Sequence, residues 1–425
     1  MHYAFSFVYL ISALSISLFS QNLGVVTIYN SGNSDLTYNQ INCLEFVDNG
    51  ELWIGTQNGI SIFNSMADSW INIPNKNLPS NIISALEFNN SANYSSMFLG
   101  HTEGITLALW DNTLIETELE NITWDNQYGA ACSPNNGIIS SILYDNELWS
   151  GSTDGLCVEG LGPEGTWLIQ NTSTEFYSNN ITSIKKNTNN GMIAIGTMNG
   201  GLVTYDGTFN IYYSSNSDIL DNSVLDVAFD QNNNIIICTP QAGLGVLTEG
   251  GSWIWFNTVN SSLPSNSLKN VIVDNNNNLW ITTLENGLIQ YKNNVFYNYT
   301  TENSDLPDNK INCLQLGENN QIWLGTETSG LIKINTPITS INGHNPLVQS
   351  ISPTIFDSKI HIDVLESGHI YIYNQYGQLI DTKILSIGNN YINTTDYTSG
   401  LYFILTESRN KRSVNTVIKQ TSSTF

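Results

Sequence analysis

Few residues in this chain could support catalysis, and their types restrict the chemistry. Between residues 21 and 335 the only histidine is His101, so a general acid or base working near neutral pH would have to use it. The chain has no Gly-x-Ser-x-Gly nucleophile elbow, no Cys-x-x-Cys pair, and no Walker or Rossmann glycine pattern. We therefore predict a protein that is not an enzyme. The alternative is an extracellular lyase or hydrolase that acts on a carbohydrate or another polymer.

Two loops combine carboxylate and amide side chains, the oxygen ligands that calcium prefers. They are Asp230 to Asn234 and Asp274 to Asn278. Hairpin turns favour Asp and Asn for reasons of local backbone bonding alone. We therefore expect no cofactor, and calcium is the one metal that these loops would suit.

A unit of about 45 residues recurs seven times and would position all of these side chains. Each copy has an apolar strand that ends in a pair of small residues, then two variable residues, then in most copies glycine and an apolar residue. A repeat of this length with several short strands is typical of a propeller blade. We predict an all-β, seven-bladed β-propeller over residues 21–335. The first residues of the small pairs are 42 to 51 positions apart: Gly55, Gly100, Gly151, Gly196, Cys238, Thr282 and Gly325.

The last repeat lacks the fourth strand that the earlier copies carry, because the pattern stops after Asn335. Residues 25–30 resemble those fourth strands and precede the first repeat. We predict that this N-terminal strand completes the last blade, because closure satisfies backbone groups at an open sheet edge.

The turns that follow the small pairs are predicted to form a ligand-binding face, together with the turns before each first strand. Variable loops on a rigid scaffold commonly carry function. Their carboxylates would suit a cation or a basic or neutral polymer, and the alternative is that they are only solvated turns. The candidate ligand-binding residues are Gln57, Asn58, Thr102, Glu103, Thr153, Asp154, Met198, Asn199, Glu285, Asn286, Glu327 and Thr328.

Tryptophan occupies the same place in four repeats, at Trp53, Trp149, Trp280 and Trp323. Equivalent aromatic residues suggest packing between blades, and we predict that they are buried. A platform for stacking sugars is the alternative interpretation.

The charge of the chain limits its partners. The net charge is −24, and no arginine occurs before Arg409. Nucleic acid that is bound without sequence preference needs a basic surface, so this class is excluded. Residues 4–19 are apolar and too few to cross a bilayer comfortably. They predict a signal peptide (residues 1–20) that is cut after Ser20, with an uncleaved anchor as the alternative. No other stretch could form a stable membrane span.

The five cysteines are scattered along the chain. Cys43 and Cys313 hold equivalent places in the first and last repeats, and we expect both to be free thiols that pack as small apolar residues. An oxidising compartment would also allow a disulfide between Cys132 and Cys157.

The repeat ends before residue 336, and the remaining chain has a different pattern. Residues 336–346 read as a polar linker. Residues 347–425 contain about seven short alternating segments, which predict a small antiparallel, immunoglobulin-like β-sandwich. Six of those segments are 359–364, 368–373, 378–384, 390–393, 400–406 and 415–419, with a turn at 374–377.

Both regions resemble known families. Leu52-Trp53-Ile54-Gly55-Thr56 and Ile322-Trp323-Leu324-Gly325-Thr326 are similar to the two-component regulator propeller repeat. Residues 347–425 resemble the C-terminal sorting domain of the type IX secretion system of Bacteroidota. The second resemblance is carried by residues 369–374 and Gly377-Gln378, and by a sorting motif of Ser399, Gly400, Leu401, Tyr402, Phe403, Ile404 and Lys419.

The second resemblance implies export through the periplasm and across the outer membrane by the type IX secretion machinery. It also implies removal of the C-terminal domain, followed by release or by attachment to surface lipopolysaccharide. We predict a secreted or cell-surface protein that binds an extracellular glycan or protein.

Overall fold

The computed structural model describes residues 23–335 and 348–419, apart from gaps at 66, 74–76, 92–93, 112–121, 127–137, 145, 161–167, 353–354, 357, 365–366, 375–377, 399 and 409–410. The chain divides into two compact units, Met1–Thr336 and Pro337–Phe425. The expected signal peptide, the linker 336–346, Cys132 and Ser399 lie outside the described residues.

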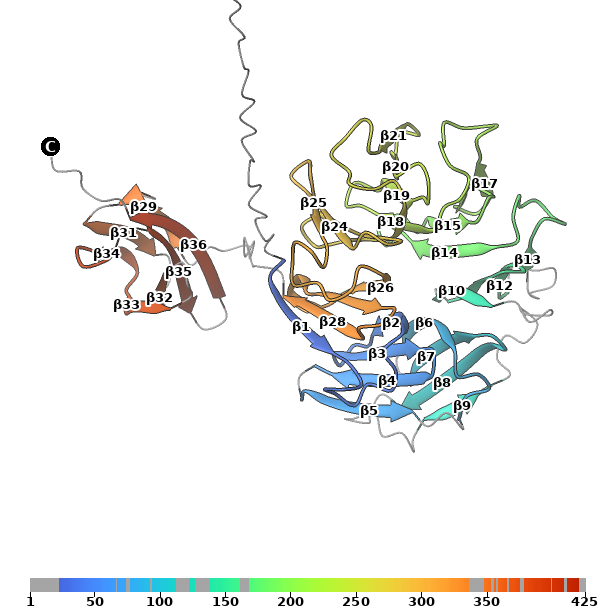
Figure 1. Ribbon diagram of the computed structural model, residues 1–425, viewed down its shortest axis with the longest axis horizontal. Coiled ribbons are helices and arrows are strands. Elements are labelled where there is room, and N and C mark those ends of the chain that lie inside the picture. The colour runs from blue at the N-terminus through green and yellow to red at the C-terminus, as the bar shows by residue number, and fades with distance from the viewer. Residues whose placement is uncertain are drawn as a thin grey trace, which may run out of the picture. The chain divides into compact units, whose positions relative to one another are not determined.

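The first unit is a seven-bladed β-propeller of four-stranded antiparallel sheets (Figure 1). The first strand of each blade contacts the first strand of the next, and β26 (Ile311–Leu316) of the last blade contacts β2 (Ile41–Phe46) of the first, so the ring is closed. Blade one continues with β3 (Glu51–Thr56), β4 (Gly59–Asn64) and β5 (Ser69–Ile73). Blade two contains β6 (Ile83–Asn90), β7 (Tyr94–His101), β8 (Gly104–Asp111) and β9 (Thr123–Asp125). Blade three contains β10 (Ile139–Tyr144), β11 (Leu148–Ser152), β12 (Gly155–Val158) and β13 (Leu168–Gln170). Blade four contains β14 (Ile181–Lys186), β15 (Ile193–Thr197), β16 (Leu202–Tyr205) and β17 (Phe209–Tyr212); blade five contains β18 (Asp226–Phe229), β19 (Ile235–Cys238), β20 (Leu244–Leu247) and β21 (Trp253–Phe256); blade six contains β22 (Leu268–Val273), β23 (Leu279–Thr283), β24 (Leu288–Lys292) and β25 (Val295–Tyr299).

The last blade is completed from the other end of the sequence, as predicted. Its own strands are β26, β27 (Ile322–Thr326) and β28 (Leu331–Asn335), and a short 3-10 turn, η5 (Glu318–Asn320), joins the first two. The N-terminal strand β1 (Val25–Tyr29) pairs antiparallel with β28, with Val25 opposite Asn335 (Figure 1). The sheet order β1-β28-β27-β26 therefore leaves no blade with three strands among the seven that are described.

The glycine of the repeat makes room for the next blade. A Cβ placed on Gly100 would lie 2.6 Å from Cγ2 of Ile139, which begins the first strand of the following blade. A Cβ on Gly325 would overlap Cγ2 of Ile41 and lie 2.6 Å from Sγ of Cys313. Real Cβ contacts of this length are repulsive, so glycine at this position lets the inner strands approach closely.

The four equivalent tryptophans are buried and pack at the seams between blades, which confirms the packing interpretation. The indole of Trp323 in blade seven lies 5.7 Å from the ring of Phe63 in blade one. The indole of Trp149 lies 5.1 Å from Tyr205 of the next blade. At most 2% of each of the four tryptophans is exposed, so none of them can serve as a sugar platform in this state.

The second unit is a sandwich of two sheets. One contains β29 (Val348–Ser352), β31 (Lys359–Val364) and β34 (Gly388–Asn393), and the other contains β30 (Ile355–Phe356), β32 (Gly368–Asn374), β33 (Leu379–Leu385), β35 (Gly400–Ser408) and β36 (Lys411–Lys419). Ile362 of the first sheet and Ile372 and Ile404 of the second share one buried core. The expectation of a wholly antiparallel sandwich was wrong at one place, because the two-residue strand β30 pairs parallel with β36. The immunoglobulin-like topology stays a prediction.

Candidate functional site

The turns between the second and third strands share one hydrogen-bonding design. In blade one, the hydroxyl of Thr56 donates to the carbonyl oxygen of Gly59 at 2.9 Å and accepts from the backbone N–H of Asn58 at 3.0 Å. Gly59 has a φ of 96°, which favours glycine because this region is strained for other residues. Ser152 of blade three and Thr326 of blade seven make the same pair of bonds. These turns are therefore held rigidly from within.

His101 takes the place of this hydroxyl in blade two. Its Nδ1 accepts from the backbone N–H of Glu103 at 3.1 Å, and its Nε2 lies 3.0 Å from the hydroxyl oxygen of Thr106. The side chain is fully buried, and burial lowers the pKa of His101 to about 4. A neutral ring with both nitrogens engaged stabilises a turn and offers no base to a substrate, so the geometry favours the structural role.

Backbone bonds join these turns to the connectors that precede the first strands. The N–H of Gln57 donates to the carbonyl oxygen of Gln40 in the same blade at 3.2 Å. The N–H of Gly59 donates to Asn81 in the connector of the next blade at 2.6 Å. The last pair closes the circle, because Gly330 donates to Asn39 at 3.2 Å. Such bonds join five of the seven pairs of neighbouring blades in the described part of the chain. We call the face of the ring that carries these turns and connectors the turn face.

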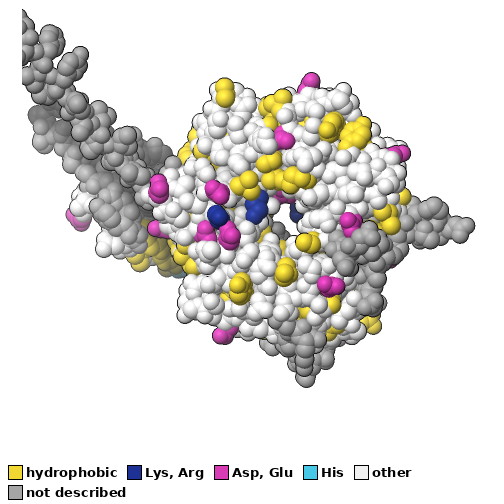
Figure 2. Space-filling model, turned by 45° about the vertical axis from the view of Figure 1, so that its right-hand side comes forward, with side chains coloured by type: hydrophobic (Ala, Val, Ile, Leu, Met, Phe, Trp, Pro, Cys, Tyr) yellow, Lys and Arg dark blue, Asp and Glu magenta, His cyan; other side chains and the backbone are white. Residues whose placement is uncertain are grey.

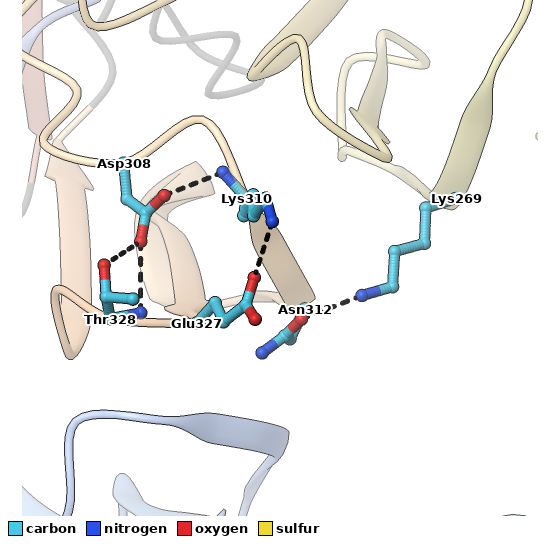
Figure 3. A network of polar contacts seen from close by, with 6 residues as sticks. All are labelled: Lys269, Asp308, Lys310, Asn312, Glu327 and Thr328. Carbon is cyan, nitrogen blue, oxygen red and sulfur yellow. Dashed lines mark hydrogen bonds and ion pairs between the residues drawn. The ribbon is translucent and has the colours of Figure 1, made fainter.

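All twelve candidate ligand-binding residues lie in these turns, but their exposure differs. Glu103 and Glu285 are exposed, whereas Asp154 and Glu327 are partly buried. A salt bridge of 3.5 Å joins Glu327 to Lys310. Asp308 accepts from the hydroxyl of Thr328 at 2.7 Å (Figure 3). The face is acidic as expected, but part of its charge at blade seven is already engaged.

Large apolar side chains are also exposed on the turn face, and the sequence analysis did not include them. Ile82 and Ile138 immediately precede the first strands of blades two and three, Leu220 lies in the connector before blade five, and Leu284 begins the turn of blade six. Figure 2 shows hydrophobic and acidic side chains around the central opening of the ring. The signal in the sequence was an apolar residue at a connector position where other repeats carry polar ones.

In the hairpin loops that suggested calcium, the aspartate carboxylates already accept hydrogen bonds from donors of the same hairpin. The Asp274 carboxylate accepts from the backbone N–H groups of Asn276 and Asn278, each at 2.9 Å, and from the indole N–H of Trp280 at 3.2 Å. Asp230 accepts comparable bonds from its own loop. Among the described residues, no cluster of three or more His, Cys, Asp or Glu could hold a metal ion. Calcium binding stays a prediction, and local hydrogen bonding explains the loops without it.

The central channel contains charged residues that the sequence analysis missed. Glu45 and Glu87 hold the fifth position of the first strands of adjacent blades, and Lys185 holds it in blade four. Burial raises the pKa of Glu45 to about 8 and that of Glu87 to about 7, although Lys185 acts in the opposite direction. Nε2 of Gln315 donates to Glu45 at 3.2 Å. Aligning the fifth positions of the seven repeats would have identified this charged tier.

A cavity of about 430 Å³ opens beside this tier, where the hairpins between first and second strands meet. It therefore lies at the strand ends opposite the turn face. Lys185, Gln231 and Gln315 are among its lining residues.

The cysteines agree with the expectation for the closing seam. Cys43 and Cys313 are free, and so is Cys238. Burial is the main cause that raises the pKa of all three thiols. Cys157 is disulfide-bonded, and Cys132, its expected partner, lies outside the described residues.

The sorting motif lies mainly on β35, with Lys419 at the end of β36. Tyr402 is buried, and its hydroxyl donates to the carbonyl oxygen of Thr398 at 2.8 Å. Nζ of Lys419 donates to the carbonyl oxygen of Thr394 at 3.1 Å. Gly400 pairs with Lys419 and Leu401 with Ile418, while Phe403 and Ile404 pair with Thr416 and Asn415. The motif thus contributes to the packing of this sandwich.

Comparisons with known proteins agree with both units. Residues 350–420 match the secretion system C-terminal sorting domain, and residues 305–328 match the two component regulator propeller. No curated protein matches the chain.

Two solved structures are similar to the chain. The first is the extracellular domain of the putative hybrid two component system BT3049 from B. thetaiotaomicron, at 16% identity and a TM-score of 0.59; the alignment covers 94% of this chain and 57% of that one. The second is PorZ, a surface component of the type-IX secretion system of Porphyromonas gingivalis, at 15% identity and a TM-score of 0.53; the alignment covers 90% of this chain and 60% of that one. The chain therefore spans about three fifths of each neighbour, and the likeness shows the fold.

These observations define a class. The protein is a β-propeller protein that carries a C-terminal sorting domain of the type IX secretion system. In the described parts of the chain, no helix has the length and apolarity to cross a membrane.

Proposed function

We propose that this protein is an extracellular binding module, exported through its C-terminal domain, whose partner docks on the turn face of the propeller. The observation that carries the proposal is the set of backbone bonds that links turns and connectors at five of the seven blade junctions in the described part of the chain. A rigid framework with variable tips is the usual arrangement of binding loops on a scaffold.

Catalysis at the turn face has little support in this geometry. An enzyme would need a group that titrates near neutral pH and faces a substrate. His101 is buried with both ring nitrogens occupied, and Glu45 and Glu87 lie inside the channel, away from the turns.

The proposed localisation follows from the sorting domain. Residues 1–20 would direct the chain to the periplasm, and the C-terminal unit would direct it across the outer membrane. Removal of this unit, and release or attachment to lipopolysaccharide, would follow export.

The test is a glycan and peptide array probed with the full chain, followed by charge reversal of a hit. Changing Glu103, Glu285 and Glu327 together to lysine should abolish binding. The matched control reverses Asp206, Glu249 and Glu318, which are exposed on hairpins at the other ends of the strands. If the control triple abolishes binding and the first triple does not, the binding face has been assigned wrongly.

A further inference from the structure

The mouth of the channel on the turn face is built from one pair of residues in each blade. The pair consists of the first residue of the turn and the residue that precedes the first strand. Blade five is the exception: β19 ends at Cys238 and β18 begins at Asp226, and the equivalent repeat positions are Pro240 and Ser223. Backbone bonds join the pairs of blades one, four, six and seven, as between Met198 and Asn180 at 2.9 Å and between Glu327 and Lys310 at 3.0 Å. In chain order the pairs are Gln40 and Gln57, Ile82 and Thr102, Ile138 and Thr153, Asn180 and Met198, Ser223 and Pro240, Ser267 and Leu284, and Lys310 and Glu327.

The pairs are not alike around the ring. Blades two to six each contribute one apolar residue, and we call Ile82, Ile138, Met198, Pro240 and Leu284 the apolar arc. Ile82, Ile138 and Leu284 are 38%, 46% and 40% exposed. Blades seven and one contribute charged and amide side chains instead. Figure 2 shows hydrophobic side chains beside the central opening, and lysine and acidic side chains on its left.

Acidic residues lie next to the arc. Glu103, Asp154 and Glu285 come directly after the first turn residues of blades two, three and six. Leu220, which is 59% exposed, is followed by Asp221 in the connector of blade five. The lysine of the mouth, Lys310, is already paired with Glu327. The surface thus combines exposed aliphatic groups with negative charge.

This combination distinguishes polypeptides from sugars. Aliphatic patches bordered by charge are typical of protein–protein contacts. Sugars, in contrast, stack on aromatic faces. The four equivalent tryptophans of the repeat are buried at the blade seams, and the exposed rings of the connectors, Tyr38 and Tyr177, are not part of the apolar arc.

We propose that the apolar arc binds a polypeptide segment that carries aliphatic side chains flanked by lysine or arginine. Its aliphatic groups would cover Ile82, Ile138 and Leu284, and its basic groups would meet Glu103, Asp154 and Glu285. This inference rests on the proposed function, because it names the partner class of the same face.

The test uses the full chain and three synthetic eight-residue peptides that alternate Leu-Lys, Ser-Lys or Leu-Glu. Binding is measured by fluorescence anisotropy at physiological salt. The Leu-Lys peptide should bind at least about tenfold more tightly than either control, because it alone supplies both kinds of group. Changing Ile82, Ile138 and Leu284 together to serine should reduce that affinity by about tenfold or more. The matched control is Val295→Ser, at a residue that is 42% exposed on a hairpin away from the mouth, and its affinity should equal that of the unchanged protein.

Four results would overturn the inference. Equal affinity for Ser-Lys and Leu-Lys would show that charge alone attracts the peptides. Unchanged affinity in the triple serine variant would place the peptide elsewhere. A glycan that binds the turn face, with no peptide binding there, would refute the polypeptide and leave the proposed function standing. A hit that binds away from the turn face would refute both.

Discussion

Replacing Gly325 by alanine should destabilise the propeller at the seam that the N-terminal strand closes. The added Cβ would overlap Cγ2 of Ile41 and lie 2.6 Å from Sγ of Cys313. Neither neighbour can move away easily, because Ile41 is fully buried at the start of β2 and Sγ of Cys313 lies on a short side chain with one torsion angle. The new methyl group therefore has no space without movement of an inner strand.

The expected cost follows from the general cost of overpacking a dense core, about 1–3 kcal/mol. No backbone strain contributes, because Gly325 does not adopt a positive φ. Gly250→Ala is the matched control: Gly250 is exposed, its Cβ would meet only Oγ1 of Thr248 at 3.8 Å, and this change should be close to neutral. Changing Ile41 to alanine alone should cost about 2–5 kcal/mol through the cavity it leaves.

The decisive assay is a double-mutant cycle measured by urea unfolding. Ile41→Ala removes the closest atom to the new methyl group, so the double variant should be less destabilised than the sum of the single variants. Couplings between contacting residues are about 0.5–3 kcal/mol. Strict additivity, or a Gly325→Ala variant as stable as the Gly250→Ala control, would refute the proposed packing of blade seven on blade one.

Three further predictions test other parts of the structure. Trp149→Ala should cost about 3–5 kcal/mol because it removes a buried indole from a blade seam, and an unchanged unfolding midpoint would contradict the packing interpretation. The pKa of His101 is lowered to about 4 in the folded chain, so the unfolded chain binds more protons at this site below pH 6.5. The stability contributed by neutral His101 is therefore present above pH 6.5 and declines as the pH falls towards 4. His101→Thr, which restores the hydroxyl of the other turns, should flatten the loss of stability between pH 6.5 and 4, and an equally steep loss in the variant would show that other groups cause it. Residues 347–425 fused to a passenger should direct it outside a cell that has the type IX system, whereas passenger found in the periplasm would refute the sorting role.

The propeller fold could be predicted from the sequence because the repeated residues lie at the contacts between blades. Gly100 and Gly325 mark where an inner strand of the next blade approaches, and Trp323 marks a blade seam. The missing strand after Asn335 was sufficient to predict the pairing of β1 with β28. The parallel pairing of β30 was not predictable, because two residues carry no periodicity.

The candidate site was predicted less completely. The turn positions followed from the repeat, and so did their acidic character. The salt bridge between Lys310 and Glu327 depends on side-chain directions that spacing does not specify. The exposure of Ile82 and Ile138 could not be predicted either, because an apolar residue next to a strand is interpreted as part of that strand. The charged tier of Glu45, Glu87 and Lys185 depends on three blades meeting across the channel, which no single repeat reveals.

Hydrogen–deuterium exchange of the full chain, with and without a ligand identified on the array, tests whether the turn face is the binding surface. A ligand on the turn face should slow exchange in the turns 57–59, 198–201 and 284–287 and in the connectors beside them. Exchange should be unchanged in the hairpins 187–192 and 230–234 at the other ends of the strands. Protection confined to those hairpins, with none in the turns, would contradict the assignment of the turn face as the binding surface.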